Sequence, residues 1–127
     1  MRVFETKWFA RFARKQKLDD RRLLEAVSRA GEGMIDADLG KGLIKQRVAR
    51  AGAGKSGGYR TIIALRAGDR AIFIYGFAKS ERDNVDEGDL ERLQTPAREL
   101  LGLSDSEIDL AVKAGKLTEI KDEENLS

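Results

Sequence analysis

The middle of the chain constrains the fold most strongly, because it predicts three antiparallel strands in succession. Residues 43–50 alternate between apolar and charged side chains, as half-buried strands do. Residues 59–66 are rich in β-branched side chains, and residues 70–77 are apolar almost throughout, which is typical of a central strand. A glycine-rich loop at 52–58 joins the first two strands, and a tight turn at 67–69 joins the last two.

Two helical segments precede these strands. Residues 7–17 place Trp8, Phe9 and Phe12 at helical spacing, and we expect these aromatic side chains to form a core stripe rather than a platform for stacking bases. Asp19 is the predicted N-cap of the second helix. We therefore expect a helical hairpin packed against a sheet.

The sequence after the third strand is again helical. Pro96 interrupts an apolar stripe, so it either kinks one helix or opens a new helix with Thr95 as the cap. Ser104 and Glu107 form a capping box at the start of another helix, and Gly115 ends it. C-terminal helices therefore complete an α+β fold.

The local structure of four shorter segments can also be predicted. Residues 1–5 predict a short first strand, and residues 34–42 predict a connecting loop. The apolar residues around 117–120 predict a last strand-like contact. Residues 121–127 form a polar, acidic tail that we expect to fray.

Charge is distributed unevenly along the chain. Residues 41–79 hold nine Lys and Arg against a single acid, Asp69, for a formal charge of +8. Residues 80–127 hold six Lys and Arg against fourteen acids, for a charge of −8. Because the basic segment coincides with the predicted strands, we expect a basic sheet face that meets phosphates.

The composition excludes several classes of function. The chain has no Cys and no His, which rules out a disulfide framework, a thiolate metal site and a hydrolase of the Ser-His-Asp kind. Acid–base chemistry must then use Lys, Arg, Tyr, Asp, Glu or the substrate itself. There is no apolar run long enough for a membrane span and no apolar signal-peptide core near the N-terminus. We expect a cytoplasmic protein without a cofactor or metal.

The glycine-rich loop has two interpretations. Its segment Gly54-Lys55-Ser56 resembles part of a nucleotide-binding P-loop, but Ala49 stands where that motif needs glycine, and a strand follows in place of a helix. The loop is either a flexible hairpin connection or a source of free backbone N–H groups that, with Lys55, contact an RNA phosphate.

The strongest candidate site lies on the predicted strands. Lys45 and Arg47 are two residues apart and project from one face, and Arg60 on the next strand can join them. Such a cluster would stabilise the extra negative charge on a phosphate under attack, although charged strand faces are often merely solvated. Tyr75 and Lys79 end the third strand, where Tyr75 is either a core aromatic or a group at the rim of the site.

Three motifs in this order resemble the RelE/ParE superfamily, the toxins of bacterial type II toxin–antitoxin modules. They are Lys-Gln-Arg-Val at 45–48, Ser-Gly-Gly-Tyr-Arg at 56–60 and Tyr-Gly-Phe-Ala-Lys-Ser-Glu-Arg at 75–82. The resemblance is closest to the HigB-like RelE branch and covers about residues 2–93.

This resemblance implies a RelE-like α+β fold in a single domain over residues 1–127. The expected fold has a small antiparallel sheet, an N-terminal helical hairpin and C-terminal helices. We expect a core over about residues 1–93, with residues 94–127 as a helical C-terminal extension that ends in the frayed acidic tail.

The resemblance also implies a ribosome-dependent, metal-independent mRNA endonuclease. In this family the ribose 2′-OH attacks the neighbouring phosphate and leaves a 2′,3′-cyclic phosphate. Carried over by position, the candidates for catalysis are Lys45, Arg47, Arg60 and Lys79, with Arg60 at the scissile phosphate; Tyr75 is a further catalytic candidate. Further candidates for binding RNA or the ribosome are the basic residues Lys41, Arg50, Lys55, Arg66 and Arg82.

Two positions depart from the family pattern and leave alternatives open. Ser80 stands where an arginine is expected, and Asp86 lies near the place of an expected tyrosine. Tyr75 or Lys45 could take part in proton transfer instead. The alternatives are a ParE-like toxin that binds a protein target without cutting RNA, and a plain RNA-binding module. Either kind of toxin implies a cognate antitoxin, expected to be a helix-turn-helix protein.

Overall fold

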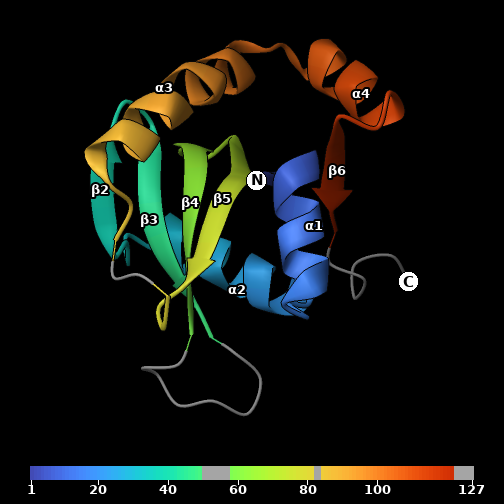
Figure 1. The fold of residues 1–127 in the computed structure, drawn as a ribbon. Coiled ribbons are helices and arrows are strands. Elements are labelled where there is room, and N and C mark those ends of the chain that lie inside the picture. Colours follow the sequence, from blue (N-terminus) through green and yellow to red (C-terminus); the bar gives the residue numbers. More distant parts are fainter. Residues whose placement is uncertain (50–57, 82–83, 122–127) are drawn as a thin grey trace.

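The described part of the chain forms one mixed sheet with helices on both faces (Figure 1). The structure, a computed structural model, describes residues 1–49, 58–81 and 84–121. In chain order the elements are β1 Arg2–Thr6, α1 Lys7–Lys15, α2 Asp20–Gly31, β2 Ala37–Gly40, β3 Leu43–Val48, β4 Tyr59–Arg66, β5 Arg70–Ala78, α3 Glu87–Gly102, α4 Asp105–Lys113 and β6 Leu117–Ile120. The six strands lie in the order β2-β3-β4-β5-β1-β6.

The three predicted middle strands are confirmed. Strands β3, β4 and β5 are consecutive antiparallel neighbours, and β5 is an interior strand as its apolar sequence predicted. Strand β1 lies parallel to β5 on its other side, and β6 pairs antiparallel with β1 at the sheet edge. The last strand-like contact predicted near residues 117–120 is therefore also confirmed.

The prediction of a loop over residues 34–42 was wrong in part. Residues Ala37–Gly40 form β2, which pairs antiparallel with β3 at the other sheet edge. The Ala-Asp-Leu-Gly sequence of β2 has little intrinsic preference for strand. Pairing with β3, which no local pattern reports, holds this segment in the sheet.

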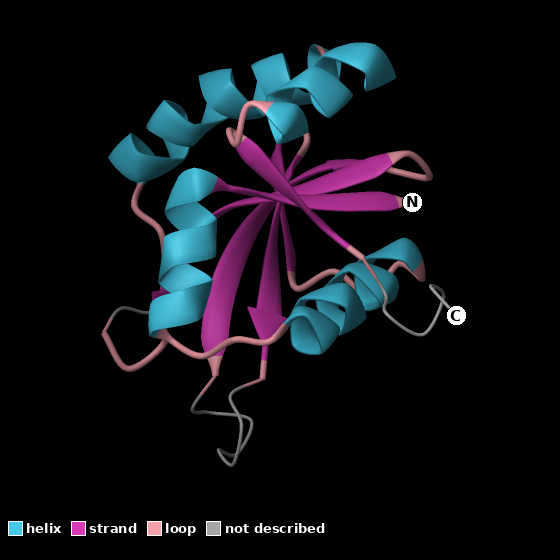
Figure 2. Ribbon diagram, turned by 90° about the vertical axis from the view of Figure 1, so that its right-hand side faces the viewer, coloured by secondary structure: helices cyan, strands magenta, loops and turns pink. Residues whose placement is uncertain are grey.

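Two hydrophobic layers flank the sheet. On one face, α1 and α2 pack Phe9, Leu23 and other apolar side chains against Ile63 and Phe73. On the opposite face, apolar residues of α3 and α4 pack against a second set of strand residues that includes Ile62. Figure 2 shows helices above and below the twisted strands. Among the described residues, no helix has the length and apolar character needed to span a membrane.

Local capping sets most of the helix boundaries. Thr6 caps α1 by accepting from the Phe9 N–H at 3.2 Å, and Asp19 caps α2 as predicted. The predicted capping box at the start of α4 is confirmed, since Ser104 and Glu107 each accept a hydrogen bond from the other's backbone N–H. These caps satisfy N–H groups that have no partner within the helix.

Helix α3 runs unbroken through its proline. Pro96 lies inside Glu87–Gly102, so the alternative in which Thr95 caps a new helix was wrong. Asp86 provides the cap instead, accepting from the Asp89 N–H at 2.7 Å. Ala97 next to the proline is fully buried, so packing against the sheet holds the helix together where Pro96 removes one of its hydrogen bonds.

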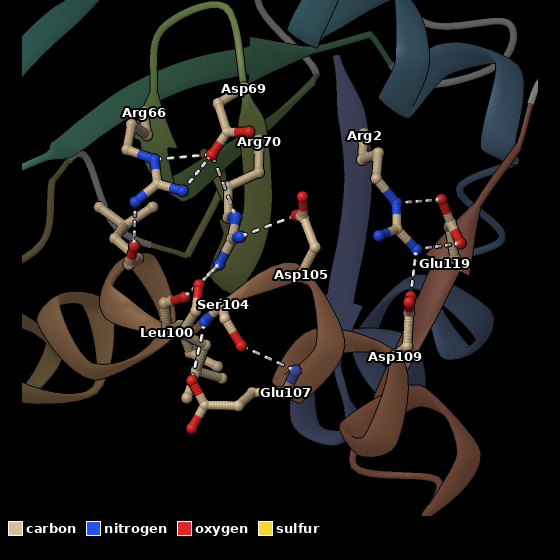
Figure 3. A network of polar contacts seen from close by, with 12 residues as sticks. Arg2, Arg66, Asp69, Arg70, Leu100, Ser104, Asp105, Glu107, Asp109 and Glu119 are labelled. Atoms are coloured by element: carbon tan, nitrogen blue, oxygen red, sulfur yellow. Dashed lines mark hydrogen bonds and ion pairs between the residues drawn. The ribbon is translucent and has the colours of Figure 1, made fainter.

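Buried Arg70 fastens the junction between α3 and α4 to the sheet (Figure 3). Its guanidinium donates to the carbonyl oxygens of Leu100 and Leu103 at 3.0 and 2.7 Å, and pairs with Asp105 at 3.2 Å. Two carbonyl oxygens and one carboxylate thereby offset the cost of burying the Arg70 guanidinium, since this side chain is only 2% exposed.

A second arginine ties the C-terminal segment to the first strand. Arg2 on β1 pairs with Asp109 of α4 at 2.8 Å and with Glu119 of β6 at 3.0 Å (Figure 3). Residues 94–121 therefore belong to the same sheet and core as the rest of the described chain. The frayed tail was predicted for residues 121–127, and all of it but residue 121 lies outside the described residues. The division into domains stays a prediction.

Candidate functional site

Strand pairing brings four of the predicted site residues into two adjacent rows. Arg47 on β3 lies directly opposite Arg60 on β4, and Lys45 lies opposite Ile62. Ile62 is paired in turn with Tyr75 on β5. The rows lie at the end of the sheet where β3 ends and β4 begins.

Three of these residues project from one face of the sheet. The intervening Gln46 points to the opposite face, where its side-chain amide donates to the Ala26 carbonyl of α2 at 2.9 Å. Because side chains alternate along a strand, Lys45 and Arg47 point the other way, and Arg60 shares their face as the cross-strand partner of Arg47. We call Lys45, Arg47 and Arg60 the basic cluster.

The backbone bonds of Arg47 show which kind of cross-strand pair it forms with Arg60. Its N–H donates to a carboxylate oxygen of Asp36 at 2.5 Å, and its carbonyl oxygen accepts from Arg29 at 2.5 Å. Arg47 and Arg60 therefore form the non-hydrogen-bonded kind of antiparallel pair, in which side chains stand closest. Like charges directly opposite one another in such a pair destabilise the sheet.

Arg60 is held in an electrostatically unfavourable position. Its side chain is buried, with 7% of the residue exposed, and its one described hydrogen bond is a long one of 3.5 Å to the Tyr59 carbonyl. Burial, followed by repulsion from Arg47, lowers the pKa of Arg60, and Asp36 opposes the shift. Arginine keeps its charge at neutral pH, so the site retains a cation that has no ion-pair partner among the described residues.

The basic cluster has unused donors. Among residues 1–49, 58–81 and 84–121, no ion pair within 4.0 Å involves Lys45, Arg47 or Arg60. The Nε of Arg47 is buried without a hydrogen-bond partner, and Lys45 reaches only the amide oxygen of Asn84 at 3.3 Å. Cations on neighbouring strands, one buried and two half-buried, that have free N–H groups form a site for an anion.

Lys79 lies at the same end of the sheet as the basic cluster. It follows β5, and its N–H donates to the Gly58 carbonyl at 3.3 Å, next to the start of β4. Three other predicted RNA contacts, Arg50, Lys55 and Arg82, lie outside the described residues.

Two other predicted RNA contacts lie at the opposite end of the sheet. Lys41 occupies the turn between β2 and β3, where its ammonium contacts the side-chain oxygen of Gln94 at 3.4 Å. Arg66 ends β4, where it pairs with Asp69 and donates to the Leu101 carbonyl at 2.6 Å. The structure does not bring these residues together with the basic cluster.

The two departures from the family pattern have different surroundings. Ser80 is exposed in the turn after β5. Asp86 is the N-cap of α3 and is therefore engaged by the helix backbone. Within the described chain, no three acidic residues gather in a way that could hold a metal ion.

An aromatic surface beside the basic cluster was missed by the sequence analysis. The core-stripe prediction is confirmed for Phe9, which is fully buried, but Trp8 is 43% exposed. Trp8 stacks on Tyr75 with ring centroids 4.8 Å apart, and on Phe12 at 5.6 Å. A signal was present in the sequence, because α1 carries four basic residues and no acid, which is unusual for a helix that serves only the core.

Comparison with known proteins points to one family. The family model described as "RelE toxin of RelE / RelB toxin-antitoxin system" matches residues 1–120. A search of curated proteins finds no match to this sequence.

Proposed function

The chain belongs to the RelE toxin family of toxin–antitoxin systems, and we propose that it is a ribosome-dependent, metal-independent mRNA endonuclease that inhibits translation. The family implies an antitoxin partner. We further propose that the chain belongs to the HigB-like branch, on the strength of the motifs at 56–60 and 75–82, and that it acts in the cytoplasm, where ribosomes translate.

The observation that carries this proposal is the cross-strand pair formed by buried Arg60 and half-buried Arg47, which has no ion-pair partner among the described residues. Two arginines directly opposite each other, whose repulsion the nearby Asp36 only partly offsets, cost stability in the free protein. A phosphate placed between them would remove that cost, since guanidinium groups match phosphate oxygens with paired hydrogen bonds.

The proposed reaction requires only groups that this chain and RNA supply. The 2′-oxygen forms a bond to the adjacent phosphorus, and the bond from phosphorus to the 5′-oxygen of the next nucleotide breaks. A base accepts the proton from the 2′-OH, and an acid donates one to the leaving 5′-oxygen. Our candidates for these two transfers are Tyr75 on β5 and Lys45 on β3, which flank Ile62 of the intervening strand β4.

In this proposal the arginines stabilise the additional negative charge on phosphorus in the transition state. Their donors are fixed by the sheet before substrate binds, so little reorganisation accompanies the reaction. Loss of one such donor from comparable sites lowers the rate by about 100- to 1,000-fold. Lys79, at the same end of the sheet, would contribute long-range attraction to the RNA backbone.

The proposed partners follow from the same chemistry. The ribosome would present single-stranded mRNA to the basic end of the sheet, and an antitoxin of the helix-turn-helix type would inhibit the toxin. Arg50, Lys55 and Arg82 are proposed contacts to RNA or ribosome, and Lys41 and Arg66 are proposed contacts only if the ribosome also reaches the opposite end.

One observation favours a second candidate function. The position near the family's expected tyrosine is Asp86, whose carboxylate is committed to capping α3 and supplies no proton transfer. A toxin that lacks this group could arrest growth by binding a protein target without cutting RNA.

The decisive experiment compares wild type with Arg60→Ala in a purified translation system, with mRNA 5′ ends mapped after the toxin is added. Arg98→Ala is a matched control, because Arg98 is an exposed arginine on α3. We expect new cuts within translated codons for wild type and Arg98→Ala, and loss of cutting for Arg60→Ala. Growth arrest when the wild type is expressed in a bacterium, without any cuts in the purified system, would support the target-binding alternative.

A further inference from the structure

A groove beside the basic cluster combines aromatic and cationic groups. It has a volume of about 740 Å³ and lies between α1 and the end of β5. Among the described residues, its aromatic lining comes from Trp8, Phe12, Tyr75 and Phe77, and its cations are Arg11 and Lys15. We call it the aromatic groove.

The aromatic groove is built around a fixed but exposed indole. Trp8 is held by stacking on Tyr75 and Phe12, yet 43% of its surface faces solvent. The close approach of α1 depends on Gly76, since a Cβ at that position would stand 2.6 Å from a ring carbon of Phe12. Exposed aromatic surface that is held rigid suits stacking with the flat face of a nucleobase.

The charge on α1 favours a polyanion as the occupant. The helix sequence Lys-Trp-Phe-Ala-Arg-Phe-Ala-Arg-Lys contains four basic residues and no acidic one. None of the four takes part in an ion pair among the described residues. Among the described residues that line the groove, Glu81 is the one acid, against Arg11 and Lys15. This excess of positive charge attracts a phosphate backbone and repels a basic protein segment.

The aromatic groove and the basic cluster share an edge. Tyr75 lines the groove and also lies in the same cross-strand row as Lys45, separated from it by Ile62. Neighbouring strands are about 4.8 Å apart, so Lys45 and Tyr75 are separated by about 10 Å across the sheet. A phosphate at the basic cluster and a base in the groove can therefore belong to neighbouring nucleotides of one strand.

From these observations we infer that the aromatic groove is a nucleobase subsite, in which Trp8 stacks on an RNA base next to the phosphate held by Arg47 and Arg60. The inference rests on the proposed function in placing that phosphate at the basic cluster. Arg11 and Lys15 hold the adjoining backbone, and the subsite selects the nucleotide beside the cut.

Trp8 is the sole tryptophan of the chain, so its fluorescence reports on the groove directly. The first test titrates the protein with a short 2′-O-methyl RNA, which lacks the attacking hydroxyl, and with the same strand carrying abasic residues. We expect saturable quenching by the intact strand, and at least a fivefold weaker response to the abasic strand. Equal quenching by both strands, or no quenching by either, would overturn the inference.

This test separates the subsite from the catalytic proposal. Arg60→Ala should weaken binding of the intact strand but leave the quenching amplitude at saturation unchanged, because the base still stacks on Trp8. Quenching by a wild-type protein that cuts no mRNA would support the subsite while refuting the nuclease.

The second test measures cutting in the translation system with Trp8→Ala and Trp8→Phe. Stacking on one base contributes enough binding free energy that Trp8→Ala should cut at least about 10-fold more slowly than wild type, with an altered preference for the nucleotide at the cut. Trp8→Phe keeps an aromatic ring and should retain most of the cutting rate. Circular dichroism would verify that both variants fold. Cutting by Trp8→Ala at the wild-type rate and sites would overturn the inference, and if antitoxin inhibition is lost at the same time, the groove is a protein-binding site.

Discussion

Replacing Arg60 by methionine should stabilise the protein while it abolishes activity. Arg60 is buried, faces Arg47 across the strands and has no carboxylate partner among the described residues. Methionine is unbranched and flexible, so it fills irregular space without a charge. The change removes the cationic repulsion and the cost of burying the guanidinium, and retains most of the packing.

The expected change in the free energy of unfolding is the sum of two stabilising contributions, partly offset by a third. Relief of the like-charge pair is worth up to about 1 kcal/mol, and relief of poorly satisfied buried donors about 1–3 kcal/mol. Loss of the attraction between Arg60 and Asp36 acts in the opposite direction. We expect the free energy of unfolding to rise by about 1–2 kcal/mol.

Urea denaturation followed by Trp8 fluorescence would measure this change. The matched control is Arg66→Met on the same strand, where the arginine is paired with Asp69 and bonded to the Leu101 carbonyl, so its loss should destabilise the protein. Added inorganic phosphate should raise the midpoint of wild type more than that of Arg60→Met, because it binds the folded cluster. Destabilisation of both variants by similar amounts would refute the view that the basic cluster is strained and awaits an anion.

Three further predictions concern the framework of the site. Burial raises the pKa of Glu5 from 4.5 to about 7, so the free energy of unfolding should fall as pH rises from about 4.5 to 7. The Glu5→Gln variant should lack that pH dependence. In urea titrations at pH 8 it should be about 2–3 kcal/mol more stable than wild type. Arg70→Met should lower the free energy of unfolding by about 3 kcal/mol, because carbonyls at the junction of α3 and α4 lose their donor and Asp105 its partner; a loss below about 1 kcal/mol would contradict that account. Gly76→Ala should cost about 1–3 kcal/mol and shift the emission of the tryptophan, since the new Cβ displaces Phe12; unchanged stability and emission would show that α1 adjusts freely.

Local sequence patterns predicted the elements whose determinants are local. The strands β3 to β5 were found from alternation, β-branched content and turn residues, and Asp19 and Ser104 were found as caps because capping is a short-range signal. The segment Ala37–Gly40 was missed because its strand conformation comes from pairing with β3. The parallel placement of β1 beside β5 likewise depends on contacts about 70 residues apart in sequence.

The candidate site was predictable in composition but not in its energetics. The two-residue spacing of Lys45 and Arg47 placed them on one face, and the hairpin brought Arg60 to them. The burial of Arg60 depends on what packs over the sheet, which no residue pattern reported. The distance of Arg66 from the cluster follows from strand direction, since it lies six residues beyond Arg60 along β4.

The chemical identity of the ends at a cut site tests the central claim most directly. mRNA cut in the purified translation system would be analysed for its terminal groups, and a matching mRNA with a single 2′-deoxynucleotide at the cut position would be tested alongside it. We predict a 2′,3′-cyclic phosphate on one fragment, a 5′-hydroxyl on the other, and no cutting at the 2′-deoxy position. A 5′-phosphate end, or cutting that persists without the 2′-hydroxyl, would contradict the proposal that the basic cluster promotes attack by the neighbouring ribose.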